Sequence, residues 1–297
     1  MLVDTIIANL LIPLGLMAWL WFDQDQRKID WLLKAGICGA VVMLCFLAGT
    51  WQELSYALRY ILAALFLIVA YLSYRRVREH PFWHESAGGR LVTYISVIAL
   101  SALALYNVDV LRGFWYTGEP ITLAFPLRGG IYYVTEGGTH VLLNGHIVTN
   151  GTPYALDIEA LNGLGRHSRG FFPSRVTDYE IYGATLYSPC AGQVVETMNV
   201  IPDSPVNELY KASRAMNQVV LQCGDVRVLM GHLLQGSVTV QKEDRVQAGQ
   251  PLGKVGNSGK SKRPHLHIQA DRSSGQFDAV PILFDGVFLV RNSIVVR

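Results

Sequence analysis

The sequence predicts an α-helical transmembrane N-terminal region followed by an all-β, antiparallel C-terminal domain. From Met1 to about Arg112 the chain is a series of apolar blocks separated by short polar clusters. Only 16% of all residues are charged, well below the roughly 25% of globular proteins. Beyond this region, short alternating runs are separated by Gly, Asp or Pro turns, which favours antiparallel strands. We therefore expect a transmembrane region over residues 1–112 and a β-rich domain over 113–297.

Four apolar blocks are expected to be membrane-spanning helices, since a bilayer core needs about 20 apolar residues. The first block carries no charge and ends in Trp19 and Trp21, aromatic residues typical of a membrane interface. The third block is the shortest, and it spans only if it starts near Leu54 with Arg59 reaching back to the headgroups. The four blocks are Thr5 to Phe22, Ala35 to Gln52, Tyr60 to Tyr74 and Leu91 to Val108.

Basic residues predict the orientation of these helices. They are frequent between the first and second blocks and between the third and fourth, whereas the intervening loop offers only Arg59. Loops rich in Lys and Arg face the cytoplasm. Four spans, or two spans plus a buried hairpin of blocks two and three, then leave the β-rich domain on the extracytoplasmic side. A net charge of +2 is too small to indicate nucleic acid binding.

The four cysteines divide evenly between the two regions. Cys38 and Cys45 fall in the second apolar block and are interpreted as small hydrophobic residues. Cys190 and Cys223 fall in the exported domain, where an oxidising environment permits a disulfide. Whether they are bridged depends on their Cα separation, which the sequence does not contain.

Three stretches of the β-rich domain contain candidate catalytic or metal-binding residues. In a strand, successive side chains alternate between faces, so the two histidines of "RPHLHIQ" share one face and Leu266 turns into the core. The stretches are "NGHIVTNGTPYALDIEAL" with His146 and Asp157, "LMGHLL" with His232, and "RPHLHIQ" with His265 and His267.

Two histidines and one aspartate match the ligand count of a catalytic zinc site, which keeps its fourth position for water. A further histidine can accept a proton from that water, and another can stabilise an oxyanion. Each histidine alone is more often an ordinary polar residue. Asp157 lies between apolar residues, where an unpaired carboxylate is costly to bury. A cation, an arginine or backbone N–H groups would each remove that cost.

The stretch "GKVGNSGKS" resembles a phosphate-binding loop, but it lacks one required residue. The motif G-x-x-x-x-G-K-[ST] needs glycine at position 254, where the chain has Lys254. We interpret this loop as a turn that leads a strand into the site.

Together, "PYALDI", "GHLLQGSVTV", "EDRVQAGQPLGKVGNSG" and "PHLHIQ" resemble the lysostaphin and LytM family of zinc metalloendopeptidases over about residues 121–290. The resemblance implies the duplicated hybrid motif fold. It implies that His146, Asp157 and His267 bind Zn²⁺, and that His265 and His232 assist catalysis. It also implies hydrolysis of peptide bonds in the stem peptides or cross-bridges of peptidoglycan, outside the bacterial plasma membrane.

Two departures from the family pattern leave alternatives open. Ten residues intervene between His146 and Asp157 where the most familiar members have three, so His140 is an alternative ligand. An insert over 163–182 and a basic turn are candidates for the rim of the groove; the turn contains Lys260, Lys262 and Arg263. The rival functions are a non-catalytic LytM-like module that regulates other cell-wall hydrolases, and a membrane signalling or transport protein.

Overall fold

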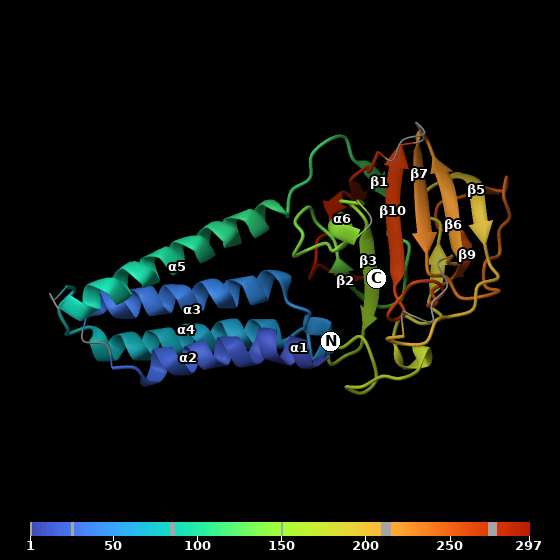
Figure 1. The fold of residues 1–297 in the computed structure, drawn as a ribbon. Coiled ribbons are helices and arrows are strands. Elements are labelled where there is room, and N and C mark those ends of the chain that lie inside the picture. Colours follow the sequence, from blue (N-terminus) through green and yellow to red (C-terminus); the bar gives the residue numbers. More distant parts are fainter. Residues whose placement is uncertain (1, 25–26, 84–86, 150, 209–214, 273–277) are drawn as a thin grey trace. The chain divides into compact units, whose positions relative to one another are not determined.

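The computed structural model describes all residues except 1, 25–26, 84–86, 150, 209–214 and 273–277. The chain folds as two compact units, Met1–Leu111 and Arg112–Arg297. Figure 1 shows that the first is helical and the second is built mainly of strands.

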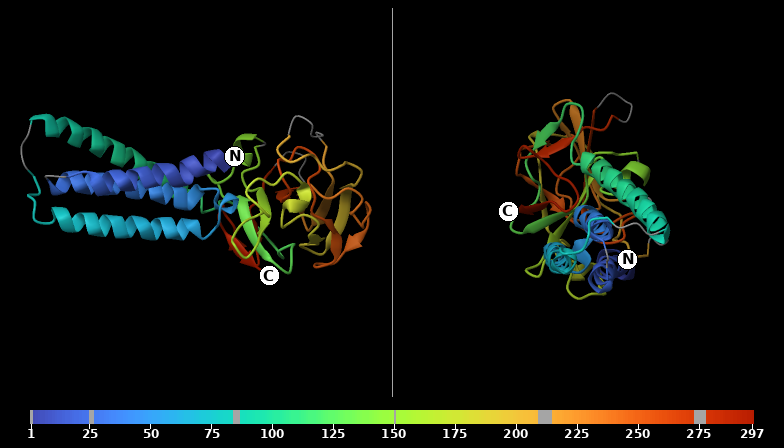
Figure 2. Two further views of the ribbon diagram at one scale, coloured as in Figure 1. Left: turned by 90° about the horizontal axis from the view of Figure 1, so that it is seen from below. Right: turned by 90° about the vertical axis from the view of Figure 1, so that its left-hand side faces the viewer.

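The first unit contains four helices that are long and apolar enough to cross a membrane, Leu2–Phe22, Lys28–Ala48, Leu58–Val77 and Arg90–Arg112. The first of these is continuous through α1 (Leu2–Ile6), a π-helical turn (Ile7–Leu11) and α2 (Ile12–Phe22), and the others are α3 (Lys28–Ala48), α4 (Leu58–Val77) and the longer α5 (Ala87–Arg112). Helices α2, α3 and α4 pack side by side (Figure 2). The amide of Asn107 on α5 donates to the carbonyl of Ala40 on α3.

The second helix ends four residues before the expected position. Gly49 leaves the helical conformation after Ala48, and a short 3-10 turn follows at Trp51–Glu53. The indole of Trp51 is fully buried and donates to the carbonyl of Cys45, 2.8 Å away. The same carbonyl accepts from the backbone N–H of Gly49 at 2.9 Å, so Trp51 packs against the last turn of the helix, a contact that apolar content alone does not reveal.

Arg59, for which a reach back to the headgroups is expected, packs against aromatic rings of the helical unit. Its side chain is buried, and its guanidinium lies 4.0 Å from the centre of the Phe46 ring. It also donates to the hydroxyl of Tyr56 at 3.1 Å and lies over the ring of Tyr60. Aromatic faces attract a cation, so Arg59 is held inside the helical unit.

The second unit is an eight-stranded antiparallel sheet with two smaller sheets, in agreement with the predicted fold class. The order of the large sheet is β13-β2-β3-β10-β7-β6-β5-β8. Its strands are β2 (Ile131–Glu136), β3 (Leu156–Leu161), β5 (Gly192–Met198), β6 (Gln218–Cys223), β7 (Val226–Gly231), β8 (Arg245–Val246), β10 (Leu266–Arg272) and β13 (Ile294–Val296). The smaller sheets contain β1 (Ile121–Leu123), β11 (Ile282–Phe284) and β12 (Val287–Phe288), and β4 (Thr185–Tyr187) with β9 (Pro251–Lys254).

The segment between α5 and β2 contains a short strand that the sequence did not reveal. Strand β1 pairs in parallel with β11, with Ile121 opposite Ile282. Three residues are too few to show an alternating pattern, and parallel partners that are far apart in sequence carry no local signal.

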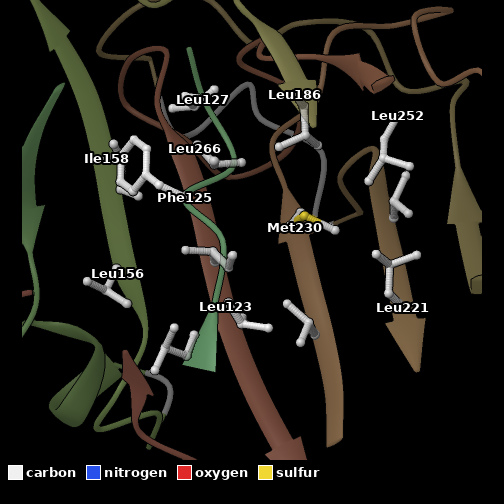
Figure 3. Close-up of a cluster of buried hydrophobic side chains, with 14 of the residues drawn as sticks. Leu123, Phe125, Leu127, Leu156, Ile158, Leu186, Leu221, Met230, Leu252 and Leu266 are labelled. Carbon is white, nitrogen blue, oxygen red and sulfur yellow. The ribbon is translucent and has the colours of Figure 1, made fainter. Parts of the chain in front are cut away.

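The hydrophobic core lies on one face of the large sheet. On β3 and β10 it contains Leu156, Ile158 and Leu266, which are labelled in Figure 3, and all three are almost fully buried. Ile268 of β10 belongs to the same cluster. Burial of Leu266 agrees with the prediction that it turns into the core. Since side chains alternate along a strand, the residues between these positions occupy the opposite face. That face carries Asp157 and His267.

The structure contains a disulfide between Cys190 and Cys223, whose Cα atoms are 6.1 Å apart. It joins the segment before β5 to the end of β6. Cys38 and Cys45 are free thiols, and Cys38 lies in an apolar cluster with Met17 and Val42.

Candidate metal centre

Two neighbouring strands provide the framework of the candidate site. Strands β3 and β10 are antiparallel, and His267 lies directly opposite Asp157 in their register. Figure 1 shows these strands side by side, with the short helix α6 (His146–Thr149) close to β3. Direct cross-strand neighbours have Cβ atoms about 5 Å apart, so strand pairing brings one imidazole and one carboxylate together.

A second imidazole completes a group of three potential ligands. Nδ1 of His267 lies 2.9 Å from Oδ1 of Asp157, and Nε2 of His146 lies 3.0 Å from the same oxygen. One donor atom from each of the three residues lies within 4.8 Å of the other two. The rings of His146 and His267 meet edge to face, with centroids 4.7 Å apart.

The described residues between His146 and Asp157, which exclude residue 150, fold back towards β3, and buried Asn144 holds this loop. Its amide nitrogen donates to the carbonyls of Gly138, Pro153 and Ala155, each 3.1 Å away. Glu136 accepts a hydrogen bond from the backbone N–H of Gly145 at 2.7 Å. The loop therefore presents the start of α6 to β3.

His140 lies outside the group of three. Its Nδ1 accepts a hydrogen bond from the backbone N–H of Leu142 at 3.1 Å, and its Cβ approaches Gly113 closely. Of the two candidates that the sequence left open, the structure brings His146 to Asp157.

Gln269 determines which nitrogen of His267 faces Asp157. Its Oε1 lies 3.0 Å from Nε2 of His267. An amide oxygen only accepts, so this contact favours hydrogen on Nε2 and leaves Nδ1 as the nitrogen that faces the carboxylate. The sequence analysis missed Gln269, although its place two residues after His267 on the same strand face was a usable signal.

His265 and His232 lie beside this group, and both are anchored through Nδ1. Nδ1 of His265 lies 2.8 Å from the carbonyl of Arg263, and Nδ1 of His232 lies 2.7 Å from the carbonyl of Ser258. Their ring centroids are 4.6 Å apart. Because a carbonyl only accepts, each neutral ring keeps its hydrogen on Nδ1 and leaves Nε2 for the site.

His232 adopts a left-handed backbone conformation with φ of 61°. Such a conformation is uncommon for a residue with a Cβ. The backbone N–H of Gly256 donates to the His232 carbonyl at 3.0 Å, which ties this residue to the loop before β10. The same loop supplies the Ser258 carbonyl, so it leads a strand into the site, as predicted.

The charges of the cluster shift the pKa of its members in opposite directions. Burial raises the pKa of Asp157, but the charges of His265 and His146 outweigh it and lower that pKa well below its usual value. Burial lowers the pKa of His146 and His265, and the Asp157 charge reverses this and raises both. Burial and then the charge of His265 lower the pKa of His232 to about 3. The carboxylate therefore attracts positive charge into the site.

A second buried cluster adjoins the first. Glu159, two residues after Asp157 on β3, is 2% exposed. Its Oε1 accepts from Nε of Arg263 at 2.5 Å, and its Oε2 accepts from Nδ1 of His167 at 2.7 Å. Burial raises the pKa of Glu159, but Arg263 and His167 outweigh it and lower that pKa to about 2.

The basic turn and the insert differ from the expected charged rim. Arg263 and His167 point into the protein, where they pair with Glu159. Lys260, Lys262, Arg169 and Arg175 remain exposed. No local pattern indicates that Arg263 and His167 pair with a buried carboxylate, because Glu159 is the neighbour of apolar residues in its strand.

The group of three residues fits a zinc ion by its chemistry. It offers two imidazole nitrogens and one carboxylate, the donor types and number of a catalytic zinc site. Two ring nitrogens lie within 3.0 Å of one carboxylate oxygen. A neutral His267 with hydrogen on Nε2 places two acceptors against each other there, and a bound cation removes that repulsion.

Part of the β-rich unit matches a known protein family. Residues 175–279 match the model of Peptidase family M23. This range contains His232, His265 and His267, whereas His146 and Asp157 precede it. No curated protein matches the chain.

Several solved structures are similar to parts of the chain. A zinc containing peptidase from Vibrio cholerae is 19% identical, with 51% of this chain and 37% of that chain covered and a TM-score of 0.31. A putative peptidase M23 from Pseudomonas aeruginosa is 16% identical, with 61% and 58% covered and a TM-score of 0.32. The catalytic domain of the antimicrobial peptidase lysostaphin from Staphylococcus simulans is 27% identical, with 39% and 74% covered and a TM-score of 0.25.

The chain thus spans less than two thirds of the length of the first two of these proteins. The family match agrees with the predicted resemblance to lysostaphin and LytM peptidases. Residues 175–279 of the β-rich unit are thus similar to peptidase family M23.

Proposed function

We propose that this chain is a membrane-anchored zinc metalloendopeptidase that hydrolyses peptide bonds in peptidoglycan. The observation that carries the proposal is the gathering of His146, Asp157 and His267 within 4.8 Å, with the imidazoles of His265 and His232 beside them. In this proposal residues 1–112 anchor the protein in a bacterial plasma membrane, and residues 113–297 act on its extracytoplasmic side.

His146, Asp157 and His267 would hold the metal through Nε2, a carboxylate oxygen and Nδ1, respectively. Gln269 fixes the His267 ring by accepting from Nε2, the kind of outer hydrogen bond that metal-binding histidines need. Bound zinc would lower the pKa of a water molecule and polarise the scissile carbonyl.

His265 is the preferred general base. Its Nε2 lies 3.5 Å from Oδ2 of Asp157, which places it nearer to the ligand carboxylate than the other catalytic candidate. With its hydrogen held on Nδ1 by the Arg263 carbonyl, the neutral ring has a lone pair on Nε2 that can accept a proton from water.

His232 is the preferred group for stabilising negative charge on the substrate carbonyl oxygen. Its Nδ1–H is committed to the Ser258 carbonyl, so it can donate from Nε2 only as an imidazolium. Its low pKa opposes that form. The exchanged assignment, with His232 as the base, therefore competes with this one, and the pH–rate profiles of the two alanine variants distinguish them.

The substrate class rests on the family. Among the similar structures, lysostaphin is described as an antimicrobial peptidase, and the lysostaphin and LytM peptidases cut peptidoglycan peptides. A position outside the plasma membrane would bring the domain to that polymer.

The alternative is a non-catalytic module that regulates other cell-wall hydrolases. Such a module has no need for a complete set of ligands and catalytic imidazoles. Here all five polar side chains gather, which favours the enzyme.

The deciding experiment uses the full chain purified in detergent. Its zinc content is measured by mass spectrometry, and the protein is incubated with purified peptidoglycan with and without a chelator. We expect one zinc per chain and chelator-sensitive peptide fragments, identified by mass. A protein that holds no zinc and releases no fragments would refute the enzyme and support the regulatory module.

A further inference from the structure

The cluster of Glu159, His167 and Arg263 has no part in the chemistry proposed above, yet it lies directly beside it. Glu159 and Asp157 occupy alternate positions of β3, so they share a face of the sheet. All three side chains are nearly buried, with 2% exposure for Glu159, 3% for His167 and 12% for Arg263. Burying charged groups is unfavourable, which makes this cluster an unexpected feature unless it performs a task.

Arg263 connects the cluster to His265. Its side chain is bound to Glu159, while its backbone carbonyl accepts from Nδ1 of His265 at 2.8 Å and from the hydroxyl of Ser261 at 2.7 Å. Pro264 lies between Arg263 and His265 and restricts the backbone on both sides. Fixing the Arg263 side chain therefore fixes the carbonyl that orients the His265 ring.

His167 connects the cluster to the insert. Its ring contacts the buried Tyr179 edge to face, with centroids 5.2 Å apart. Its carbonyl accepts from the backbone N–H of Glu180 at 2.9 Å. The base of the insert is thus attached to the same carboxylate that holds Arg263.

We propose that Glu159, His167 and Arg263 are positioning residues that keep the His265 ring in the tautomer with hydrogen on Nδ1 and the lone pair of Nε2 directed into the metal centre. The kinetic part of this inference depends on the proposed function, and the tautomer itself does not. In this proposal the insert also helps to orient the general base His265, because His167 of the insert binds the buried carboxylate of Glu159.

The test compares the wild-type chain with a double variant, Glu159→Gln with Arg263→Met, which removes both charges and leaves no unpaired ion. We expect unchanged zinc content and a KM within about twofold, because no metal ligand is altered. We expect kcat to fall about 10- to 100-fold, since small misplacements of catalytic groups have effects of that size. Arg169→Met, an exposed arginine of the same insert, serves as the control and should change neither constant.

A spectroscopic readout separates positioning from a purely structural role. Imidazole nitrogen-15 shifts of the full chain in detergent, assigned with His265→Ala, should show hydrogen on Nδ1 of His265 in the wild type. The double variant should show both tautomers, and Arg263→Lys, which keeps a cation for Glu159, should restore the wild-type pattern in part.

An unchanged tautomer together with an unchanged kcat in the double variant would overturn the inference. Parallel loss of zinc and of hydrogen-exchange protection in β10 would also overturn it, because the cluster would then support only the fold. His167→Gln, which leaves the Arg263 pair intact, provides a milder second variant with the same expected direction. If the wild type cleaves no peptide, the proposed function fails, and the nitrogen shifts still decide whether the cluster controls His265.

Discussion

Asp157 and Glu159 are two carboxylates of the same strand, two residues apart and on the same face, yet their surroundings differ. Glu159 is paired with the permanent cation of Arg263 and with His167. Asp157 is paired with His146, His265 and His267, and with no lysine or arginine among the residues that the structure describes. The permanent charge of a guanidinium neutralises a carboxylate. A carboxylate whose neighbours are all imidazoles can still bind a metal ion.

The largest difference between the two carboxylates should appear when each loses its charge. Asp157→Asn removes the anionic ligand, and we expect zinc content and peptide cleavage both to fall to background. Glu159→Gln should retain one zinc per chain. Elemental analysis of the purified full-length variants checks both. Full zinc occupancy in Asp157→Asn would show that Asp157 is not a ligand.

Loss of either catalytic imidazole should lower activity while the metal stays bound. We expect kcat to fall about 10²–10⁴-fold for the general base and about 10²–10³-fold for the oxyanion donor. His265→Ala and His232→Ala are compared as pH–rate profiles with zinc content as the control. The rate should rise with pH as the general base loses its proton. If His232→Ala removes this rise and His265→Ala does not, His232 is the base and His265 the oxyanion donor.

Removal of the Arg263 side chain should lower the free energy of unfolding, because Glu159 then loses its permanent cation. Arg263→Met leaves a buried carboxylate without its guanidinium, and breaking a buried pair in this way costs about 3–5 kcal/mol. The double variant with Glu159→Gln should recover most of that loss. Hydrogen exchange of peptides from β3 and β10 in increasing urea measures both. Equal stability of Arg263→Met and the double variant would contradict the expected loss of stability from an unpaired, buried Glu159 carboxylate.

The low pKa of Glu159 predicts a stability change in acid. The pKa is about 2 in the folded chain against an ordinary value of 4.5. A depressed pKa stabilises the fold above the unfolded-state value, and this stabilisation is lost as the pH falls from about 4.5 to about 2, on the order of 3 kcal/mol. Pulse proteolysis with pepsin across this range should show the loss in the wild type.

The same acid titration includes two comparison variants. Glu159→Gln with Arg263→Met should show a flatter profile, and neutralising Glu119, which is 90% exposed, should leave the wild-type profile unchanged. An identical slope for the double variant and the wild type would mean that Glu159 does not contribute.

The smallest predicted effect concerns the orientation of His267. Gln269→Ala removes the acceptor of Nε2, and we expect zinc affinity to fall about 10- to 100-fold with the ligands intact. Asp271→Asn, two residues further along the same face of β10, is the matched control. Competition with a fluorescent chelator measures the affinity, and an unchanged value for Gln269→Ala would remove Gln269 from the site.

Much of this architecture could be predicted from local patterns. Four apolar blocks predicted four long apolar helices, because the length and composition of such a helix are properties of one segment. The alternating runs predicted antiparallel strands, and period two predicted that Leu266 is buried while His267 faces the other side. The three-residue strand β1 and the end of α3 at Ala48 were missed, since each depends on contacts with residues outside the segment.

The sequence by itself determined that the chain contains a helical and a β-rich region and that five residues of the β-rich region are suited to a zinc hydrolase. Periodicity and residue type describe short stretches, and the resemblance to a known family connects those stretches with zinc chemistry. Only the tertiary structure decided that His146 and not His140 joins Asp157, that Gln269 orients His267, and that Arg263 and His167 are buried against Glu159. These choices depend on strand pairing between residues 110 positions apart and on the path of a loop, and both follow from the packing of the whole sheet.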